Sequence, residues 1–242
     1  MASLYLDPAL SEADAAAGRV RITGDEARHA ISVARVRVGE RLAVGDGAGL
    51  IVEGTVAAVA DGVLELDPEL VRREEPAIPE LWLAQALAKG DRDELAVQAA
   101  TELGVAGVIP WQAERSVSRW EGAKVQRGEE RWRSIVREAS KQSVRAWVPR
   151  VEPVATVSQL AALGGAVLVL EPTASAPLTG FDPAGQERIT LVVGPEGGVS
   201  PAELERLAAA GAQPVRLGSE ILRTSTAGPA ALAVLNARLG RW

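Results

Sequence analysis

The sequence contains no cysteine and only one histidine among its 242 residues. Without cysteine the chain forms no disulfide and offers no thiolate to a metal ion. A histidine-rich zinc site is excluded as well, and a Ser-His-Asp triad would have to use His29. Any chemistry must therefore come from acidic, basic or hydroxyl side chains or from backbone groups.

Long apolar runs and an excess of positive charge are also missing. No stretch of about 18 residues is uninterruptedly apolar, so we expect no membrane-spanning helix. The first residues lack the basic and apolar regions of a secretory signal, and a cytoplasmic protein without membrane contact is therefore expected. The net charge is -6, which argues against general affinity for nucleic acids. Binding of RNA would need a local basic patch.

The first part of the chain, residues 1–72, reads as short strands separated by glycine and aspartate. Strand-like runs begin at Arg41, Leu50 and Gly62, and Gly45-Asp-Gly47 is typical of a hairpin turn. These patterns predict a small β-barrel domain. A charged segment that ends in proline, residues 72–77, marks its boundary.

From residue 73 to 242 strands alternate with helices, which predicts an α/β fold with a mainly parallel sheet covered on both faces. Ser200 and Glu203 form a capping box around Pro201, and therefore start a helix. The expected strands are 80–87, 105–111, 166–171, 189–194 and 213–217, and the expected helices are 91–103, 131–145, 200–210 and 226–239.

Two glycine-bearing turns, 194–198 and 218–227, follow the last two expected strands. Neither is a P-loop or a Gly-x-Gly-x-x-Gly motif. Ligands in open α/β sheets bind at the carboxyl ends of strands, and glycine lets the backbone approach them closely. We therefore expect the two turns to form one pocket of backbone groups, which suits a neutral heteroaromatic ring better than a polyphosphate. Each turn taken alone also agrees with a plain strand-to-helix connection.

The run Val193-Gly-Pro-Glu-Gly-Gly198, followed by Leu217-Gly-Ser-Glu-Ile-Leu-Arg-Thr-Ser-Thr-Ala227, closely resembles the knotted (SPOUT-type) RNA methyltransferases. Among them it resembles the ribosomal RNA small subunit methyltransferase E family. Further matching motifs at 89–92, 98–105, 115–117 and 138–145 extend the resemblance over nearly the whole chain. The sequence departs from the family near its start, where Ser3-Leu4-Tyr5 replaces an arginine before an aromatic pair.

The resemblance implies a PUA-like RNA-binding barrel as the first domain (1–72). It implies a SPOUT methyltransferase domain with a C-terminal trefoil knot as the second (73–242). The implied reaction is S-adenosylmethionine-dependent methylation of N3 of one uridine in small-subunit (16S) ribosomal RNA, by a homodimer that needs no metal.

The candidate catalytic residues are Arg223, Glu196 and Thr224. The fixed charge of Arg223 suits the stabilisation of a uracil anion, and a salt bridge to Glu220 or Glu196 is the structural alternative. Glu196 is expected to accept ribose hydrogen bonds, to shape the glycine loop or to act as a base, and Thr224 to donate to base or cofactor. The cofactor-binding residues that the resemblance implies are Leu170, Glu171, Gly194, Pro195, Glu196, Gly197, Gly198, Leu217, Gly218, Ile221, Leu222, Thr226 and Ala227.

A basic stripe, defined as Arg133, Arg137, Lys141 and Arg145, is spaced four residues apart on the expected helix 131–145. On an acidic protein this stripe is interpreted as a track for RNA phosphates, with a solvated helix face as the alternative. The other expected RNA contacts are His29, Arg35, Arg115 and Gln142. Of Trp120, Trp132 and Trp147, at least two are expected in the core rather than stacked on a base.

Two other functions agree with much of this pattern. One is a knotted methyltransferase that modifies a ribose 2′-oxygen, and the other is an RNA-binding module without turnover. A Rossmann dehydrogenase is disfavoured because the early glycine fingerprint is missing.

Overall fold

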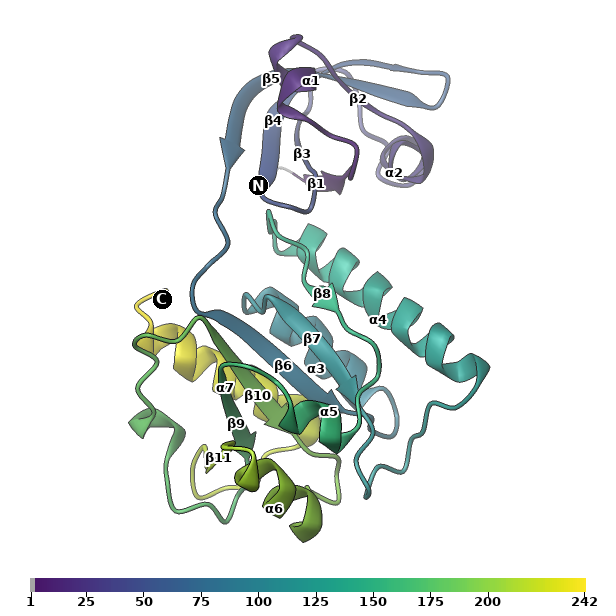
Figure 1. Ribbon diagram of the computed structural model, residues 1–242. Helices are drawn as coiled ribbons and strands as arrows, with labels where there is room; N and C mark the ends of the chain where they lie inside the picture. Colours follow the sequence, from purple (N-terminus) through teal and green to yellow (C-terminus); the bar gives the residue numbers. More distant parts are fainter. Residues whose placement is uncertain (1–2) are drawn as a thin grey trace. The chain divides into compact units, whose positions relative to one another are not determined.

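The computed structural model describes residues 3–242, and the chain divides into two compact units (Figure 1). The first unit contains the residues up to Pro76 together with Ser140–Val148. The second contains Ala77–Ala139 and Pro149–Trp242. Nothing in the sequence indicated that Ser140–Val148 would join the first unit.

The first unit is built on a five-stranded mixed sheet with the order β1-β3-β4-β5-β2. β1 and β3 are parallel, whereas the other neighbours are antiparallel. The expected hairpin turn is confirmed, because Gly45 of β3 pairs with Ile51 of β4. The elements are β1 (Ser3–Leu6), α1 (Glu12–Ala16), β2 (Val20–Ile22), α2 (Gly24–Arg28), a π-helical turn (His29–Val33), β3 (Arg41–Gly45), β4 (Leu50–Ala60) and β5 (Val63–Arg73).

The segment Ser140–Val148 packs on this sheet through small and aromatic side chains. Ala146 is buried in a cluster with Leu4, Leu6 and Ile51. The indole N–H of Trp147 donates to the carbonyl oxygen of Glu74 over 2.9 Å. Tertiary contacts therefore place a segment from the middle of the chain in the first unit.

The second unit contains a six-stranded sheet with the order β11-β9-β10-β6-β7-β8. Every strand pair in it is parallel, so the predicted mainly parallel sheet is confirmed. The elements are β6 (Glu80–Ala86), α3 (Arg92–Glu102), β7 (Gly107–Trp111), α4 (Ala123–Gln142), β8 (Arg150–Val151), α5 (Val157–Ala161), β9 (Ala166–Leu170), a 3-10 turn (Leu178–Gly180), β10 (Arg188–Val193), α6 (Pro201–Ala209), β11 (Gln213–Val215) and α7 (Thr224–Arg238).

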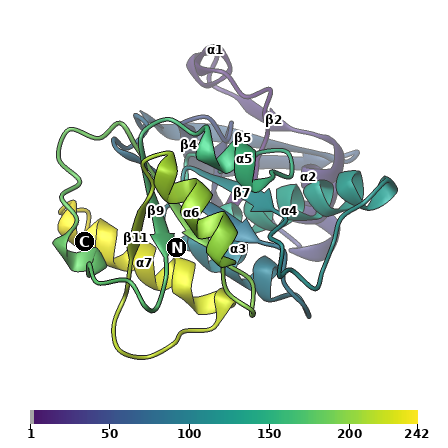
Figure 2. The same cartoon turned by 60° about the horizontal axis from the view of Figure 1, so that its bottom comes forward.

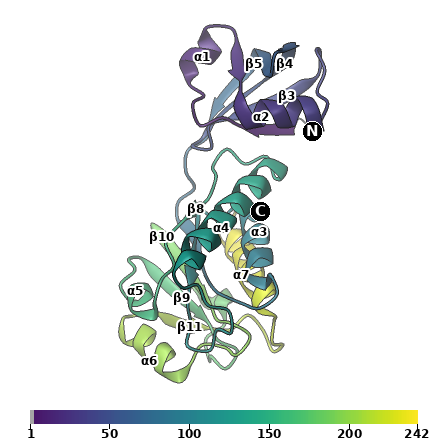
Figure 3. The same cartoon turned by 90° about the vertical axis from the view of Figure 1, so that its right-hand side faces the viewer.

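Helices cover both faces of this sheet, which is why its central strands are continuously apolar. α3 packs against α7 on one face and α5 packs against α6 on the other (Figure 3). α7 approaches the sheet closely at Gly228, where a Cβ atom would lie 2.8 Å from a methyl group of Leu83. Figure 2 shows α6 and α7 on opposite sides of β9 and β11. The loops at the carboxyl ends of these strands thus lie between the two helix layers.

Local sequence signals place some helix ends well and others poorly. The capping box of Ser200 and Glu203 is confirmed at the start of α6. The helix expected at 131–145 instead spans Ala123–Gln142, so the prediction was wrong at both ends. The first turns of α4 are mostly polar and lack apolar residues at helical spacing, so the sequence does not mark its start. The helix cannot continue beyond Val144, because this residue has a φ of 53°. Among residues 3–242, no helix has the length and apolar character needed to cross a membrane.

Candidate functional site

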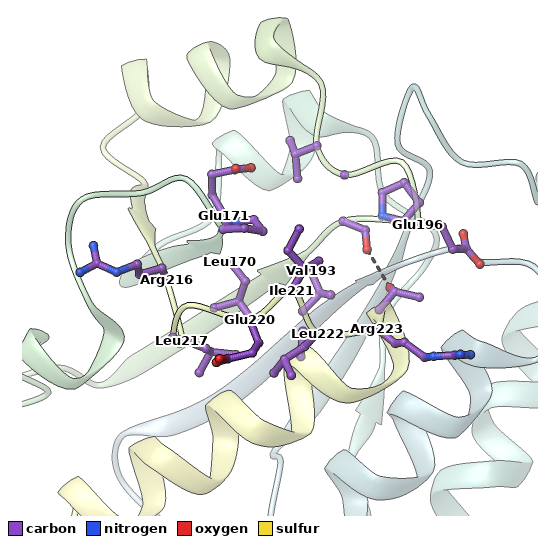
Figure 4. A pocket seen from close by; sticks show the side chains of 18 of the residues that line it. Leu170, Glu171, Val193, Glu196, Arg216, Leu217, Glu220, Ile221, Leu222 and Arg223 are labelled. Carbon is purple, nitrogen blue, oxygen red and sulfur yellow. Dashed lines mark hydrogen bonds between the residues drawn. The ribbon is translucent and has the colours of Figure 1, made fainter.

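A cavity of about 380 Å³ lies at the carboxyl ends of β9, β10 and β11 (Figure 4). The turns 194–198 and 218–227 both line it, so the prediction that they share one pocket is confirmed. Gly197 and Thr226 are not on its wall. The residues expected at the cofactor site that do line it are Leu170, Glu171, Gly194, Pro195, Glu196, Gly198, Leu217, Gly218, Ile221, Leu222 and Ala227.

Glycine is required where the chain leaves β10 and turns towards α6. A Cβ atom on Gly194 would lie 2.9 Å from the backbone nitrogen of Val199. Gly198 has a φ of 72°, a conformation that side chains disfavour. The turn therefore keeps its backbone close to the cavity only because both positions lack a side chain.

The hydroxyl group of Thr224 joins the two turns. Its Oγ1 donates to the carbonyl oxygen of Gly194 over 2.7 Å and accepts from the side-chain amide of Gln85 over 2.8 Å. Thr224 is buried, and its only hydroxyl proton is used inside the protein. The expectation that Thr224 donates to a base or a cofactor was therefore wrong for this arrangement, in which it holds the pocket together.

Glu196 ties the same turn to the segment before α3. Its Oε1 accepts from the backbone N–H of Lys89 over 3.1 Å and from the guanidinium of Arg92 over 2.8 Å. Partial burial opposes ionisation, but hydrogen bonds from its own backbone N–H and that of Lys89, and the contact with Arg92, lower the pKa of Glu196 overall. A carboxylate with a lowered pKa is a weak base, so the structure does not support Glu196 as the proton acceptor.

Arg223 lines the cavity directly before α7 and its side chain is exposed. Within residues 3–242 its guanidinium has no ion-pair partner, and Glu196 is paired with Arg92 instead. The salt bridge considered as the structural alternative is thus not formed. Figure 4 shows the Arg223 side chain extending away from Leu217 and Glu220, towards the side of the pocket where Glu196 lies. Its charge remains available to a ligand.

Several residues on or behind the wall of the pocket were not identified from the sequence. Gln85 is fully buried in β6 and positions Thr224, while Arg92 holds Glu196. Arg216 donates to the carbonyl oxygens of Ala174 and Ser175, and so fixes the loop after β9. The motif Lys89-Gly-Asp-Arg92 was a signal for Arg92. No local signal pointed to Gln85, because it reads as an ordinary strand residue.

The expected RNA-binding residues do not form one exposed row. Arg133 is exposed and pairs with Glu129 on its own helix over 3.2 Å. Lys141 is 9% exposed and pairs with Glu26 over 3.3 Å. Arg145 is half-buried, and desolvation lowers its pKa to about 10. The basic stripe as a continuous phosphate track was therefore wrong at Lys141, which is a buried partner of a carboxylate.

The remaining expected RNA contacts lie in different places. Arg115 is exposed and donates to the carbonyl oxygen of Gly197 over 3.0 Å, next to the cavity. His29, Arg35 and Gln142 are exposed in the first unit.

The three tryptophans near the basic stripe differ in burial. Trp132 is 1% exposed and lies in the core. Trp120 and Trp147 are only half-buried. The expectation of at least two core tryptophans thus holds fully for Trp132 alone. Across residues 3–242 no group of three or more acidic or histidine side chains is placed to hold a metal ion.

Family models match both parts of the chain. A model described as an RNA methyltransferase domain matches residues 74–236, and one described as an RNA methyltransferase PUA domain matches residues 22–67. Ribosomal RNA small subunit methyltransferase E of Mycobacterium bovis is 42% identical over 230 residues, which is 91% of this chain and 87% of that protein. The Bacillus subtilis protein of the same name is 33% identical over 227 residues, covering 89% of this chain and 88% of that protein.

Solved structures resemble the whole chain. Ribosomal RNA small subunit methyltransferase E from Neisseria gonorrhoeae, bound to S-adenosyl methionine, has a TM-score of 0.85 and 27% identity, with 98% of each chain covered. A methyltransferase of Legionella pneumophila, in complex with the bound cofactor SAM, also has a TM-score of 0.85, with 26% identity and 98% of each chain covered. The predicted combination of an α/β domain with a PUA-like domain is thus confirmed at the level of the fold.

Proposed function

Because this chain belongs to the ribosomal RNA small subunit methyltransferase E family, we propose that it methylates small-subunit ribosomal RNA with S-adenosylmethionine as the methyl donor. The observation that carries the proposal is the single cavity formed by the turns 194–198 and 218–227. Structures of two relatives with the same fold contain this methyl donor.

The residues of the cavity fit S-adenosylmethionine. A volume of about 380 Å³ lies in the range of small-molecule sites. The side chains of Leu170, Leu217 and Leu222 offer apolar contact to a purine, while Gly194 and Gly218 let a ligand approach the backbone closely. Glu220 has no cationic partner within residues 3–242, which suits a ligand that carries positive charge. We propose that the other expected cofactor-binding residues that line the cavity also contact S-adenosylmethionine.

We propose that the atom that accepts the methyl group is N3 of a uridine. When bound, S-adenosylmethionine supplies an electrophilic methyl group on a sulfonium sulfur. The uracil must leave its base pair and lose the proton on N3, which leaves negative charge on the ring. Arg223 lines the cavity and has no ion-pair partner among residues 3–242, and we assign to it the stabilisation of that charge. Electrostatic stabilisation and positioning are then the main contributions of this chain to the rate.

The rival reaction, methylation of a ribose 2′-oxygen, needs a base strong enough to activate a hydroxyl group. No histidine is among the residues that line the cavity, and the pKa of Glu196 is lowered rather than raised. These facts favour the nitrogen of uracil, whose proton is far more acidic than that of a ribose hydroxyl.

Binding and product analysis test the proposal. Calorimetry with S-adenosylmethionine should detect one site per chain, and no binding at millimolar concentration would contradict the assignment of the cofactor. Incubation with small-subunit ribosomal RNA, followed by mass spectrometry of nucleosides, should show N3-methyluridine. A 2′-O-methyl product would instead support the rival reaction, and binding of RNA without methyl transfer would support the non-catalytic alternative.

We further propose that the first domain binds RNA and that two copies of the chain form a dimer. The first domain, residues 1–72, is assigned to RNA binding, a role supported by the PUA match at 22–67. Two copies are expected to associate through α7 and the neighbouring α3, where Leu95 is 57% exposed. Light scattering should give the mass of a dimer.

A methyltransferase of bacterial ribosomal RNA would act in the cytoplasm, where ribosomes are assembled.

A further inference from the structure

A second cavity, of about 420 Å³, lies in the same unit beside the turn before α3. Its wall comes from that turn, from the loop after β7 and from the first half of α4. The residues that matter for its chemistry are Lys89, Val117, Ser118, Trp120, Arg131 and Trp132. None of them was assigned to the methyl-donor pocket, and the volume again lies in the range of small-molecule sites.

Aromatic surface dominates one part of this cavity. Trp120 and Trp132 meet edge to face, with ring centroids 5.6 Å apart and an angle of 78° between the planes. Trp132 is fully buried, whereas Trp120 is half-buried. The indole N–H of Trp132 is shielded from solvent and has no acceptor among the described residues. Val117 adds an apolar side chain that is 73% exposed.

The charged groups of the cavity favour a neutral ring over a phosphate. Asp93 accepts hydrogen bonds from the backbone N–H groups of Ala88 and Glu94, and the side chain of Glu94 pairs with Arg131 over 2.8 Å. Together with Asp91, the wall carries three carboxylates against the two cations Lys89 and Arg131, a balance that disfavours a phosphate group inside the cavity. The carboxylate oxygens can accept N–H groups from a base. The ammonium of Lys89 has no partner within residues 3–242 and is exposed, so it is available to a phosphate at the rim.

Hydrogen bonds connect two loops at the second cavity to the glycine turn 194–198 at the first. The Lys89 backbone and Arg92 hold Glu196 of the glycine turn. Arg115, two residues before Val117, holds the carbonyl oxygen of Gly197. The loops that line the second cavity therefore contact the turn that lines the first. These loops are therefore within reach of nucleotides that flank a base in the methyl-donor site.

We propose that the second cavity binds a nucleobase that flanks the methylated nucleotide, stacked on Trp120. The inference rests on the proposed function, because it needs an RNA strand at the first cavity. An aromatic platform, unpaired polar groups and a cation at the rim are the features by which proteins hold single-stranded nucleotides. The cavity thus contributes to the choice of substrate rather than to methyl transfer itself.

The test combines a change in the protein with a change in the RNA. A fragment of small-subunit ribosomal RNA that the wild-type protein methylates is made with an abasic site at each position next to the target. At one position the loss of the base should raise KM by about 5- to 150-fold, the range for stacking on an aromatic side chain. Trp120→Leu should raise KM for intact RNA by a similar factor, and the abasic site should then add no further loss. Trp120→Phe should keep most of the affinity.

Two outcomes of this experiment with abasic RNA overturn the inference. Either no flanking abasic site affects KM, or the effects of Trp120→Leu and the abasic site multiply as independent changes do. The affinity for S-adenosylmethionine should be unchanged in Trp120→Leu and in Trp120→Phe. This control separates loss of the RNA contact from loss of folding.

A second variant covers the case in which Trp120→Leu does not fold. Val117→Glu places a negative charge at the exposed edge of the cavity and should raise KM for RNA. Ile78→Glu is the matched control, because Ile78 is equally exposed at 73% and does not line the cavity. Equal effects of the two changes would contradict the inference. If the wild-type protein transfers no methyl group, the proposed function fails instead, and the two failures are distinguishable.

Discussion

Thr224 Oγ1 donates a hydrogen bond of 2.7 Å to the carbonyl oxygen of Gly194, and so joins the first turn of α7 to the end of β10. The same oxygen accepts from Gln85 of β6. One buried hydroxyl thus links the two glycine-bearing turns to the middle of the sheet.

Replacement of Thr224 by valine should loosen the pocket. The carbonyl oxygen of Gly194 and the amide of Gln85 would each lose a buried partner, which costs about 1–3 kcal/mol per group. We expect a lower free energy of unfolding in urea and weaker binding of S-adenosylmethionine by calorimetry. Thr224→Ser keeps the hydroxyl and serves as the control. No loss in Thr224→Val would show that the hydrogen bonds of the hydroxyl group do not hold the pocket together.

Replacement of Gly194 by alanine should push the glycine turn away from Val199. The added Cβ would lie 2.9 Å from a backbone nitrogen that has little room to move. We expect the free energy of unfolding to fall by about 1–3 kcal/mol and the affinity for S-adenosylmethionine to fall as well. Gly164→Ala is the matched control, since a Cβ atom added at Gly164 would have no neighbouring atom within 4 Å. A tolerated Gly194→Ala would contradict the close approach.

Removal of the Arg223 side chain should separate binding from turnover. Because this guanidinium has no ion-pair partner among residues 3–242, Arg223→Ala should leave the free energy of unfolding and cofactor affinity largely intact. The rate of methyl transfer should fall by about 100-fold or more, as when a charge-stabilising group is lost. Single-turnover assays measure this directly, with Arg223→Lys as a partly active control. Unchanged turnover in Arg223→Ala would remove Arg223 from the mechanism.

The ionisation of Glu196 gives a prediction for pH. Its pKa is lowered in the folded state, so its contacts with Lys89 and Arg92 stabilise the protein above the unfolded-state pKa. That contribution is lost as the pH falls through the folded-state pKa. Glu196→Gln should therefore cost about 1 kcal/mol or less at pH 7, and the difference should vanish in acid. Urea unfolding of Glu196→Gln and the wild type, measured from pH 7 down to acidic pH, checks the sign of this difference in unfolding free energy.

The activity profile of the same variant provides an independent check. If Glu196 is not the proton acceptor, the pKa values seen in kcat should be the same in Glu196→Gln and the wild type. A shift of the acid limb in the variant would return Glu196 to the role of a base.

Lys141 should matter for stability more than for RNA binding. Its ammonium is buried against Glu26, and Lys141→Glu would place two carboxylates together out of water. We expect the free energy of unfolding to fall by about 3–5 kcal/mol, the range for a broken buried pair. Arg133→Glu is the comparison, because Arg133 is exposed and its reversal should cost little stability. Equal stability of the two variants would contradict the burial of Lys141.

Local patterns were sufficient for much of the fold and for the main features of the pocket. The hairpin at Gly45-Asp-Gly47, the capping box at Ser200 and the alternation of strands with helices all depend on neighbouring residues, and the structure bears them out. The glycine turns could be identified in the same way, because strands followed by glycine and a helix cap indicate a ligand-binding edge of a parallel sheet.

Predictions failed where a residue's partner is distant in the chain. The spacing of Arg133, Arg137 and Lys141 suggested one exposed face, but Glu26, 115 residues from Lys141, takes its ammonium out of solvent. The length of α4 was underestimated because its first turns have no apolar period to mark them. Sequence spacing fixes which side chains share a helix face and leaves open what covers that face.

The sequence by itself determined the strand and helix periods, the glycine positions and the family to which the chain belongs, because each depends on residues close together or in fixed order. Only the tertiary structure decided that Thr224 binds Gly194 and Gln85, the latter 139 residues away, and that Arg92 rather than Arg223 pairs with Glu196. Hydrogen bonds and ion pairs form between groups that the fold brings within about 3 Å, and no local pattern specifies those distances.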